Sequence, residues 1–233
     1  MLLGKKPIGT CTYMGGVLST PEPFTWSWGQ MVEYNKEYLV ESNQSIYYYR
    51  STISYHVYAR NNIVDQMKGD WLLMLDTDIQ FEPDLTNRML VTLNKYNLDV
   101  LVGMYVYRNE VHSPVLFMWN KKGDFLEPLG RWDISNPDEE YLIPIGSAGA
   151  GCLLVRKKVF ERIRKELKQG PFDIIHPFSE DHSFFKRLQK LKIQPYCNPK
   201  IEVYHFGFKS YSIDDYDPNQ VLLSKKRKFK GGD

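Results

Sequence analysis

The chain has 233 residues, with 30 Lys and Arg against 28 Asp and Glu, so its formal net charge is only +2 at pH 7. This length fits one domain with a sizeable core, and the balanced charge gives no electrostatic footprint for a nucleic-acid partner. No apolar run approaches the roughly 18 residues of a membrane-spanning helix, and the opening Met1–Lys6 is too short for a signal peptide, so we expect a cytoplasmic protein without a transmembrane segment.

Strand and helix patterns alternate through the first half of the chain. Runs of apolar and β-forming residues predict strands over 7–13, 45–50, 69–76 and 99–105. Helical spacing predicts helices over 27–40, 58–67 and 83–96. This alternation favours a mostly parallel sheet flanked by helices. Ser27 is the expected N-cap of the first helix, and Ile79–Pro83 is expected to be an exit loop.

The second half is less regular. Residues 108–144 contain several Pro and Gly, which predicts short antiparallel strands and a long loop. Helices are expected over 157–168 and from Ser179 onward, with a last strand over 201–206. We expect one domain over 1–210 and a C-terminal extension over 211–233. The basic run near its end predicts a flexible tail, with weak contact to an anionic membrane surface as the alternative.

The most informative motif is Asp76-Thr77-Asp78, which follows the apolar run that predicts a buried strand. Two carboxylates in a turn at a strand end suit a hard divalent cation such as Mg²⁺ or Mn²⁺, which keeps part of its shell for water or phosphate. An EF-hand is excluded, because Phe81 and Asn87 stand where that loop needs its glycine and its bidentate glutamate. A solvated turn or helix cap is the alternative interpretation.

Two further segments carry candidate site residues. Glu180 and Asp181 fall in the first turn of a predicted helix, where the macrodipole by itself favours carboxylates. His205 lies between aromatic residues at a predicted strand end beside Gly207. A neutral imidazole there could complete a metal site, and a histidine packed in the core is the alternative.

Taken in order, these motifs resemble those of the GT-A fold glycosyltransferases, particularly the family 2-like branch, over about residues 7–206. The matching segments are Ala59-Arg60-Asn61, Leu75–Asp78 as the DxD motif, Gly149–Phe160, Glu180–Phe184 as the ED motif, and His205. The resemblance implies an α/β, Rossmann-like fold with a mostly parallel central sheet, flanking helices and a small antiparallel sheet. It also implies an enzyme that moves a hexosyl group from a nucleotide-diphosphate sugar to an acceptor hydroxyl.

The resemblance further implies a role for individual residues. Asp181 is the implied general base, and the implied partners are a UDP- or GDP-sugar donor and a carbohydrate or other hydroxyl acceptor. The implied ligands of Mn²⁺ or Mg²⁺ are Asp76, Asp78 and His205; the implied donor contacts are Thr12, Tyr13, Arg60 and Asp76; the implied acceptor contacts are Glu180 and Gly151, with Trp132 and Asp133 added from their place in a loop. Asp76 is expected to bind the metal through water or to hold the donor ribose, and the alternative for Arg60 is a surface arginine of the helix.

Departures from the family pattern limit the expected reaction. The Gln-x-x-Arg-Trp motif of processive synthases is missing, which favours a single-addition enzyme over a polymerase. Gly9–Tyr13 replaces the usual opening, so the nucleobase stays open. A carboxylate in the base position favours inversion of the anomeric configuration. The alternatives are a retaining transferase, a non-catalytic sugar- or nucleotide-binding module on a degenerate GT-A scaffold, and a nucleotidyl transferase. The last is disfavoured, because Gly15-Gly16 lacks a nearby Lys or Arg.

Overall fold

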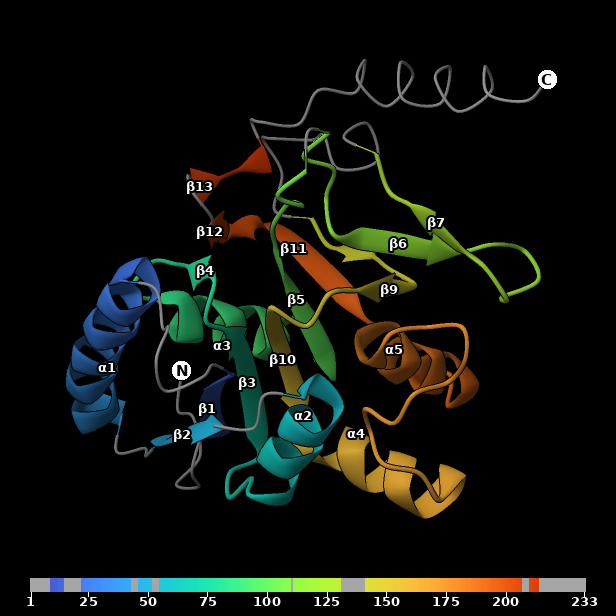
Figure 1. Ribbon diagram of the computed structural model, residues 1–233. Coiled ribbons are helices and arrows are strands. Elements are labelled where there is room, and N and C mark those ends of the chain that lie inside the picture. The colour runs from blue at the N-terminus through green and yellow to red at the C-terminus, as the bar shows by residue number, and fades with distance from the viewer. Residues whose placement is uncertain are drawn as a thin grey trace.

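A computed structural model describes residues 9–14, 22–42, 46–51, 55–109, 111–130, 141–206 and 210–213. In these residues the chain forms a central seven-stranded sheet, helices that cover it, and two small three-stranded sheets near one end of its strands (Figure 1). The central order is β2 (Ile46–Ser51), β1 (Gly9–Met14), β3 (Trp71–Asp76), β10 (Cys152–Arg156), β5 (Val100–Met104), β11 (Tyr196–Glu202) and β8 (Ile143–Pro144).

The parallel character of this sheet is only partial. Strands β2, β1 and β3 are parallel to one another, as are β5 and β11, but β10 is antiparallel to both of its neighbours and β8 is antiparallel to β11. Between β8 and β10 the chain contains only short extended segments. Two neighbouring strands can run parallel only when a crossover connection, usually a helix, brings the chain back to the starting edge of the sheet. The described segment between β8 and β10 contains no such helix. The expected mostly parallel arrangement therefore holds for the strand directions of β1, β2, β3, β5 and β11. It does not hold for β8 or for β10, which lies beside the site.

Helices cover both faces of the sheet. They are α1 (Glu22–Ser42), α2 (His56–Asp65), α3 (Leu85–Lys95), α4 (Lys157–Arg162), which continues as a π-helical turn over Ile163–Leu167, and α5 (Glu180–Lys190). The alternation of strand side chains separates two cores. On β3, Leu72 and Met74 pack with α2, α4 and α5, whereas Leu73 and Leu75 pack with α1 and α3.

Two details of the first helix and the segment after β3 differ from expectation. Helix α1 begins at Glu22, so Ser27 lies inside it and is not its N-cap. The buried Ser27 hydroxyl instead accepts a hydrogen bond from the backbone N–H of Phe81 at 3.1 Å. The expected exit loop contains a short strand, β4 (Ile79–Gln80). The backbone N–H of Phe81 is thus satisfied by a side chain 54 residues away in the sequence.

The small sheets close the end of the molecule at which β3 stops. One contains β4, β12 (Tyr204–Phe206) and β13 (Ser210–Tyr211), and the other contains β6 (Leu116–Trp119), β7 (Leu126–Pro128) and β9 (Ser147–Ala148). The strands β6 and β7 confirm the expected antiparallel pair, and residues 131–140 of the expected long loop lie outside the described residues. Pairing of β12 with β4 sets His205 opposite Ile79, next to the DxD turn.

None of the helices in the described ranges is both long enough and apolar enough to cross a membrane. Of the expected C-terminal extension, the structure describes residues 211–213.

Candidate active site

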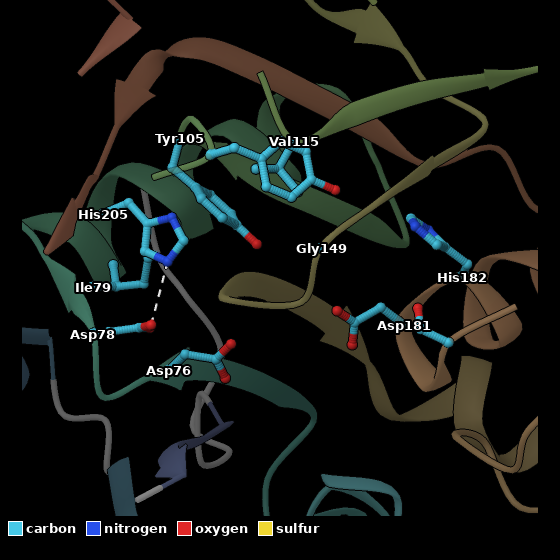
Figure 2. A pocket seen from close by; sticks show the side chains of 11 residues that line it. Asp76, Asp78, Ile79, Tyr105, Val115, Gly149, Asp181, His182 and His205 are labelled. Atoms are coloured by element: carbon cyan, nitrogen blue, oxygen red, sulfur yellow. Dashed lines mark hydrogen bonds and ion pairs between the residues drawn. The ribbon is translucent and has the colours of Figure 1, made fainter. Parts of the chain in front are cut away.

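A cavity of about 190 Å³ lies between the end of β3 and the start of α5. Figure 2 shows two groups of side chains across it, with Asp76, Asp78 and His205 on one side and Asp181 and His182 on the other. The other lining residues are Ile79, Tyr105, Tyr107, Val115, Gly149 and Ser179. Three motifs from separate parts of the sequence therefore meet at one cavity.

His205 is oriented toward Asp78 by a backbone carbonyl. Its Nδ1 lies 2.8 Å from the carbonyl oxygen of Val106, which can only accept a hydrogen bond, so Nδ1 carries a proton. In the neutral ring this leaves a lone pair on Nε2, and Nε2 lies 3.3 Å from Oδ2 of Asp78. A lone pair and a carboxylate oxygen at this distance need a proton or a metal ion between them.

Arg108 is a second partner of Asp78 and carries a permanent positive charge. Its Nη2 lies 3.0 Å from Oδ2 of Asp78, and its Nη1 donates to the carbonyl of Phe206 at 2.8 Å. Burial acts to raise the pKa of Asp78, but the hydrogen bond and charge of His205 and the charge of Arg108 outweigh it, so this pKa is lowered. Asp78 is therefore ionised at neutral pH, as a metal ligand must be.

Arg60 joins the two sides of the site from the protein interior. Its Nη2 lies 3.2 Å from both carboxylate oxygens of Asp76, and its Nε lies 3.2 Å from Oδ1 of Asp181. Glu180 Oε1 is 3.6 Å from the same Nε, and Nη1 donates to the Ala150 carbonyl at 3.3 Å. The side chain is 2% exposed and is not among the lining residues. The alternative of a surface arginine is therefore wrong, and the contacts are those of a residue that positions the two motifs.

Asp181 has a pKa raised to about 6. Burial is the main cause, and the negative charges of Glu180 and Asp76 act in the same direction, while Arg60 and a hydrogen bond from the Ala150 backbone act against it. The Asp181 side chain is 20% exposed and lines the cavity. A carboxylate that titrates near neutral pH and faces a cavity is suited to accept a proton from a bound ligand.

Two glycines let the segment before β10 pass close to Tyr105. A Cβ at Gly149 would lie 2.2 Å from the Tyr105 hydroxyl oxygen, and one at Gly151 would lie 2.9 Å from it. The N–H of Gly151 donates to that hydroxyl at 3.1 Å. Burial, with the charges of Asp76 and Asp181, raises the pKa of Tyr105 well above its ordinary value, so the phenol stays protonated. Gly151, the expected acceptor contact, supports Tyr105 and is not among the lining residues.

Sequence reasoning did not identify Tyr105, Tyr107 or His182 as lining residues. Nδ1 of His182 lies 2.7 Å from Oγ of Ser147, and its ring meets Phe117 edge-on with centroids 4.9 Å apart. Burial lowers the pKa of His182, so this imidazole is neutral at pH 7. A usable signal existed in each case. The two tyrosines stand two residues apart at a strand end and so share a face, and His182 directly follows the ED motif.

Some expected contacts lie beyond what the structure describes. Thr12 and Tyr13 are in β1, and Tyr13 pairs with Leu75 of β3, so their backbone is one strand away from the end of β3. Their side chains are outside the described part of the structure. Trp132 and Asp133 fall within 131–140 and lie outside it entirely.

The donor set fits a divalent cation of the kind that also binds phosphate. Among the described residues, no group of three or more His, Cys, Asp or Glu side chains is placed to hold a metal. Asp78 and His205 form a pair, and Asp76 contacts Arg60 but also lines the cavity. Mg²⁺ at nucleotide sites is typically held by one or two carboxylates, substrate phosphates and water. A two-residue set with an adjacent cavity meets that requirement.

Comparisons with known proteins find one matching family and similar solved structures. Glycosyl transferase family 2 matches residues 30–164, more than half of the 233 residues. Among solved structures, A197 from STIV is similar with a TM-score of 0.55 at 17% identity, over 88% of this chain and 91% of that one. GalNAc-T7 with UDP, GalNAc and Mn²⁺ is similar with a TM-score of 0.54 at 10% identity, over 90% of this chain and 44% of that one.

No curated protein sequence matches the chain. The two structural likenesses confirm the α/β GT-A fold, and the family match extends from α1 through α4 and includes the DxD motif. The chain therefore belongs to glycosyltransferase family 2.

Proposed function

We propose that this glycosyltransferase is metal-dependent and moves a hexosyl group from a nucleotide-diphosphate sugar to an acceptor hydroxyl with inversion. The observation that carries the proposal is the cavity itself. It sets Asp181, whose pKa is about 6, across from the Asp78–His205 pair. A base on one side and a cation-binding pair on the other is the arrangement required when an acceptor attacks opposite a leaving diphosphate.

On the donor side, Asp78 and His205 are the proposed ligands of Mn²⁺ or Mg²⁺, and Asp76 holds the donor ribose or a metal-bound water. When bound, the cation acts as a Lewis acid on the diphosphate oxygens that gain negative charge. The GalNAc-T7 structure contains UDP and Mn²⁺, which supports a UDP-sugar as the first donor to test, with a GDP-sugar next. Thr12 and Tyr13 remain the proposed nucleobase contacts.

On the acceptor side, Asp181 takes the proton of the attacking hydroxyl. The freed oxygen forms a bond to the anomeric carbon as the bond from that carbon to the diphosphate breaks, and the nucleoside diphosphate leaves. His182 lies beside Asp181 in the cavity wall (Figure 2) and, as a neutral imidazole, can hydrogen-bond a sugar hydroxyl. Glu180 orients the acceptor indirectly, since it contacts Arg60 and is not among the lining residues.

The donor and metal assignments predict a melting-temperature shift. We expect one class among UDP-, GDP-, CMP- and dTDP-sugars to stabilise the protein only when Mn²⁺ is present. A ligand at about 100 times its Kd adds about 2.7 kcal/mol, equivalent to about 5–10 °C for a domain of this size. Asp78→Ala is expected to abolish the metal-dependent part of the shift, because it removes the ionised ligand. Product formation from the stabilising donor, followed with a panel of sugar acceptors, then tests transfer.

The chelated protein is the control for this experiment. Equal shifts for wild type and Asp78→Ala, with or without Mn²⁺, would contradict the metal assignment. Stabilisation by a donor without transfer to any acceptor and without donor hydrolysis would favour the non-catalytic binding module.

The role of Asp181 predicts an acid limb in the pH profile. The ionised carboxylate is the active base, so its fraction falls as pH drops through its pKa of about 6. We expect kcat/KM to be flat above this value and to fall about tenfold per pH unit below it, because kcat/KM reports the free enzyme. The measurement is kcat/KM from pH 4.5 to 8.5 at saturating Mn²⁺. A profile that stays flat down to pH 4.5 would contradict Asp181 as the base.

A further inference from the structure

Arg108 forms an ion pair with the carboxylate oxygen to which the proposed metal would bind. Oδ2 of Asp78 faces Nε2 of His205 at 3.3 Å and Nη2 of Arg108 at 3.0 Å. The oxygen thus has two partners already, one of them a permanent cation. A divalent ion shared by Asp78 and His205 needs the electron pair of Oδ2 that the guanidinium engages.

We infer that Arg108 is a donor-binding residue that exchanges partners, from Asp78 when the site lacks metal to the donor diphosphate when metal and donor are bound. The inference rests on the proposed function, since it takes Asp78 as a metal ligand. Arg108 therefore pairs with an anion in both states: the Asp78 carboxylate when metal is absent, and the donor diphosphate when metal and donor are bound.

The contacts of Arg108 allow such an exchange. Its side chain is 42% exposed, so its movement uncovers no core. Within the described residues, its Nη1 also donates to the carbonyl of Phe206 at 2.8 Å. That bond uses one end of the guanidinium and leaves the Nη2 end able to turn toward another anion. The residue follows Tyr107, which lines the cavity.

The backbone beneath Arg108 is held in a defined turn. The side-chain oxygen of Asn109 accepts hydrogen bonds from the backbone N–H groups of Val111 at 3.2 Å and His112 at 2.9 Å. Tyr107 N–H donates to the Ser113 carbonyl at 3.0 Å, which closes the turn. These hydrogen bonds hold the backbone on both sides of Arg108, next to Tyr107 of the cavity lining, so the exchange requires only that the Arg108 side chain turn.

Electrostatics sets the direction of the exchange. A divalent ion on Oδ2 repels the guanidinium and weakens its pairing with Asp78. A diphosphate arriving with the metal supplies phosphate oxygens, which the planar fork of an arginine binds with two parallel hydrogen bonds. Loss of Arg108 should therefore have opposite effects on binding of metal alone and on binding of nucleotide with metal.

The test compares wild type with Arg108→Gln by calorimetric titration of MnCl₂ alone, and then of UDP or GDP in the presence of saturating Mn²⁺. We expect Arg108→Gln to bind Mn²⁺ alone about fivefold more tightly, since a partly exposed ion pair that competes for Oδ2 is gone. We expect the nucleoside diphosphate that binds wild type to bind about tenfold more weakly, since a charge-assisted phosphate contact is lost. Arg108→Lys keeps the charge, so its Mn²⁺ affinity should stay near that of wild type while its diphosphate affinity falls between the two.

Arg88→Gln is the matched control. Arg88 is also partly exposed, pairs with Asp84 and donates to a backbone carbonyl, that of Lys200. Its partner Asp84 does not line the cavity, whereas Asp78, the partner of Arg108, does. Its loss should change neither titration. Melting temperatures of all variants, measured without ligand, verify that each is folded at the titration temperature.

Affinity changes of opposite sign in Arg108→Gln, absent in Arg88→Gln, support the inference. Unchanged Mn²⁺ affinity, or weakening of both titrations, overturns it, as does the lack of Mn²⁺ binding in wild type and Arg108→Gln alike. Sugar transfer by the wild-type protein, measured separately, distinguishes failure of this inference from failure of the proposed function. If wild type transfers sugar but the affinity changes of Arg108→Gln are not of opposite sign, the proposed function holds and the partner exchange does not. If wild type transfers sugar from no donor, the proposed function itself fails.

Discussion

Asp181→Asn is expected to lower the rate of sugar transfer by about 10²- to 10⁴-fold, the usual contribution of a positioned general base. The change keeps the size of the side chain and its place at the start of α5, but an amide cannot take a proton from an acceptor hydroxyl at neutral pH. The proposed metal ligands, Asp78 and His205, lie on the other side of the cavity. The Kd for the nucleotide with Mn²⁺ should therefore stay within about threefold of the wild-type value. Single-turnover transfer rates and nucleotide titrations measure the two quantities.

Glu180→Gln is the matched control for this prediction. Glu180 and Asp181 both lie near Nε of Arg60, at 3.6 Å and 3.2 Å, so each change removes one negative charge from the same cluster. Asp181 lines the cavity and Glu180 does not. Glu180→Gln should therefore raise the KM for the acceptor more than it lowers kcat. Normal turnover by Asp181→Asn, or an equally severe loss of kcat in Glu180→Gln, would show that the base has been assigned to the wrong residue.

Arg60→Met is expected to destabilise the protein by about 3 kcal/mol, because removing one partner of a buried ion pair leaves carboxylates without compensation. For a domain of this size this corresponds to a melting temperature lower by about 6–12 °C. The effect should extend to catalysis. The charge of Arg60 lowers the pKa of Asp181, so without it that pKa rises above about 6 and the acid limb of kcat/KM moves to higher pH. Thermal melts and pH profiles of the variant measure both effects.

Arg187→Met is the control that separates these two effects. Arg187 is as buried as Arg60, with 1% exposure, but its Nη1 donates to the Ser183 carbonyl at 3.0 Å. Among the described residues, the carboxylates of Asp76, Glu180 and Asp181 pair with Arg60 and not with Arg187. We expect Arg187→Met to alter stability without moving the acid limb. If Arg60→Met also left the limb at its wild-type position, Arg60 would be a structural residue without influence on Asp181.

The carboxylates of the site could be read from the sequence because they interrupt strong local patterns. Asp76 and Asp78 end an apolar run, and Glu180 and Asp181 open an amphipathic helix; such breaks are visible without a structure. The direction of β10 could not be read in the same way. A short apolar strand has the same pattern whether it is parallel or antiparallel, and only its neighbours in the sheet decide.

Ser27 and Arg60 show a second limit. A serine near the start of a helical pattern predicts a cap, but here its hydroxyl is used by the N–H of Phe81. Arg60 lies in a matching motif, yet its burial depends on Asp181 and Glu180, which are more than a hundred residues away. Arg108 was missed for a related reason, since it belongs to none of the motifs and becomes part of the site through its contact with Asp78.

The sequence by itself determined the fold class, the order of most strands and helices, and the identity of the acidic residues and the histidine that meet at the cavity. The fold class and the order of elements follow from local periodicity, and the choice of the site residues follows from the resemblance of their motifs to those of GT-A glycosyltransferases. Only the tertiary structure decided which carboxylate titrates near neutral pH, which arginine is enclosed by carboxylates, and which arginine faces Asp78. Burial and charge act over a few ångströms of space, and the groups that supply them to Asp181 come from α2, β3 and the segment before β10.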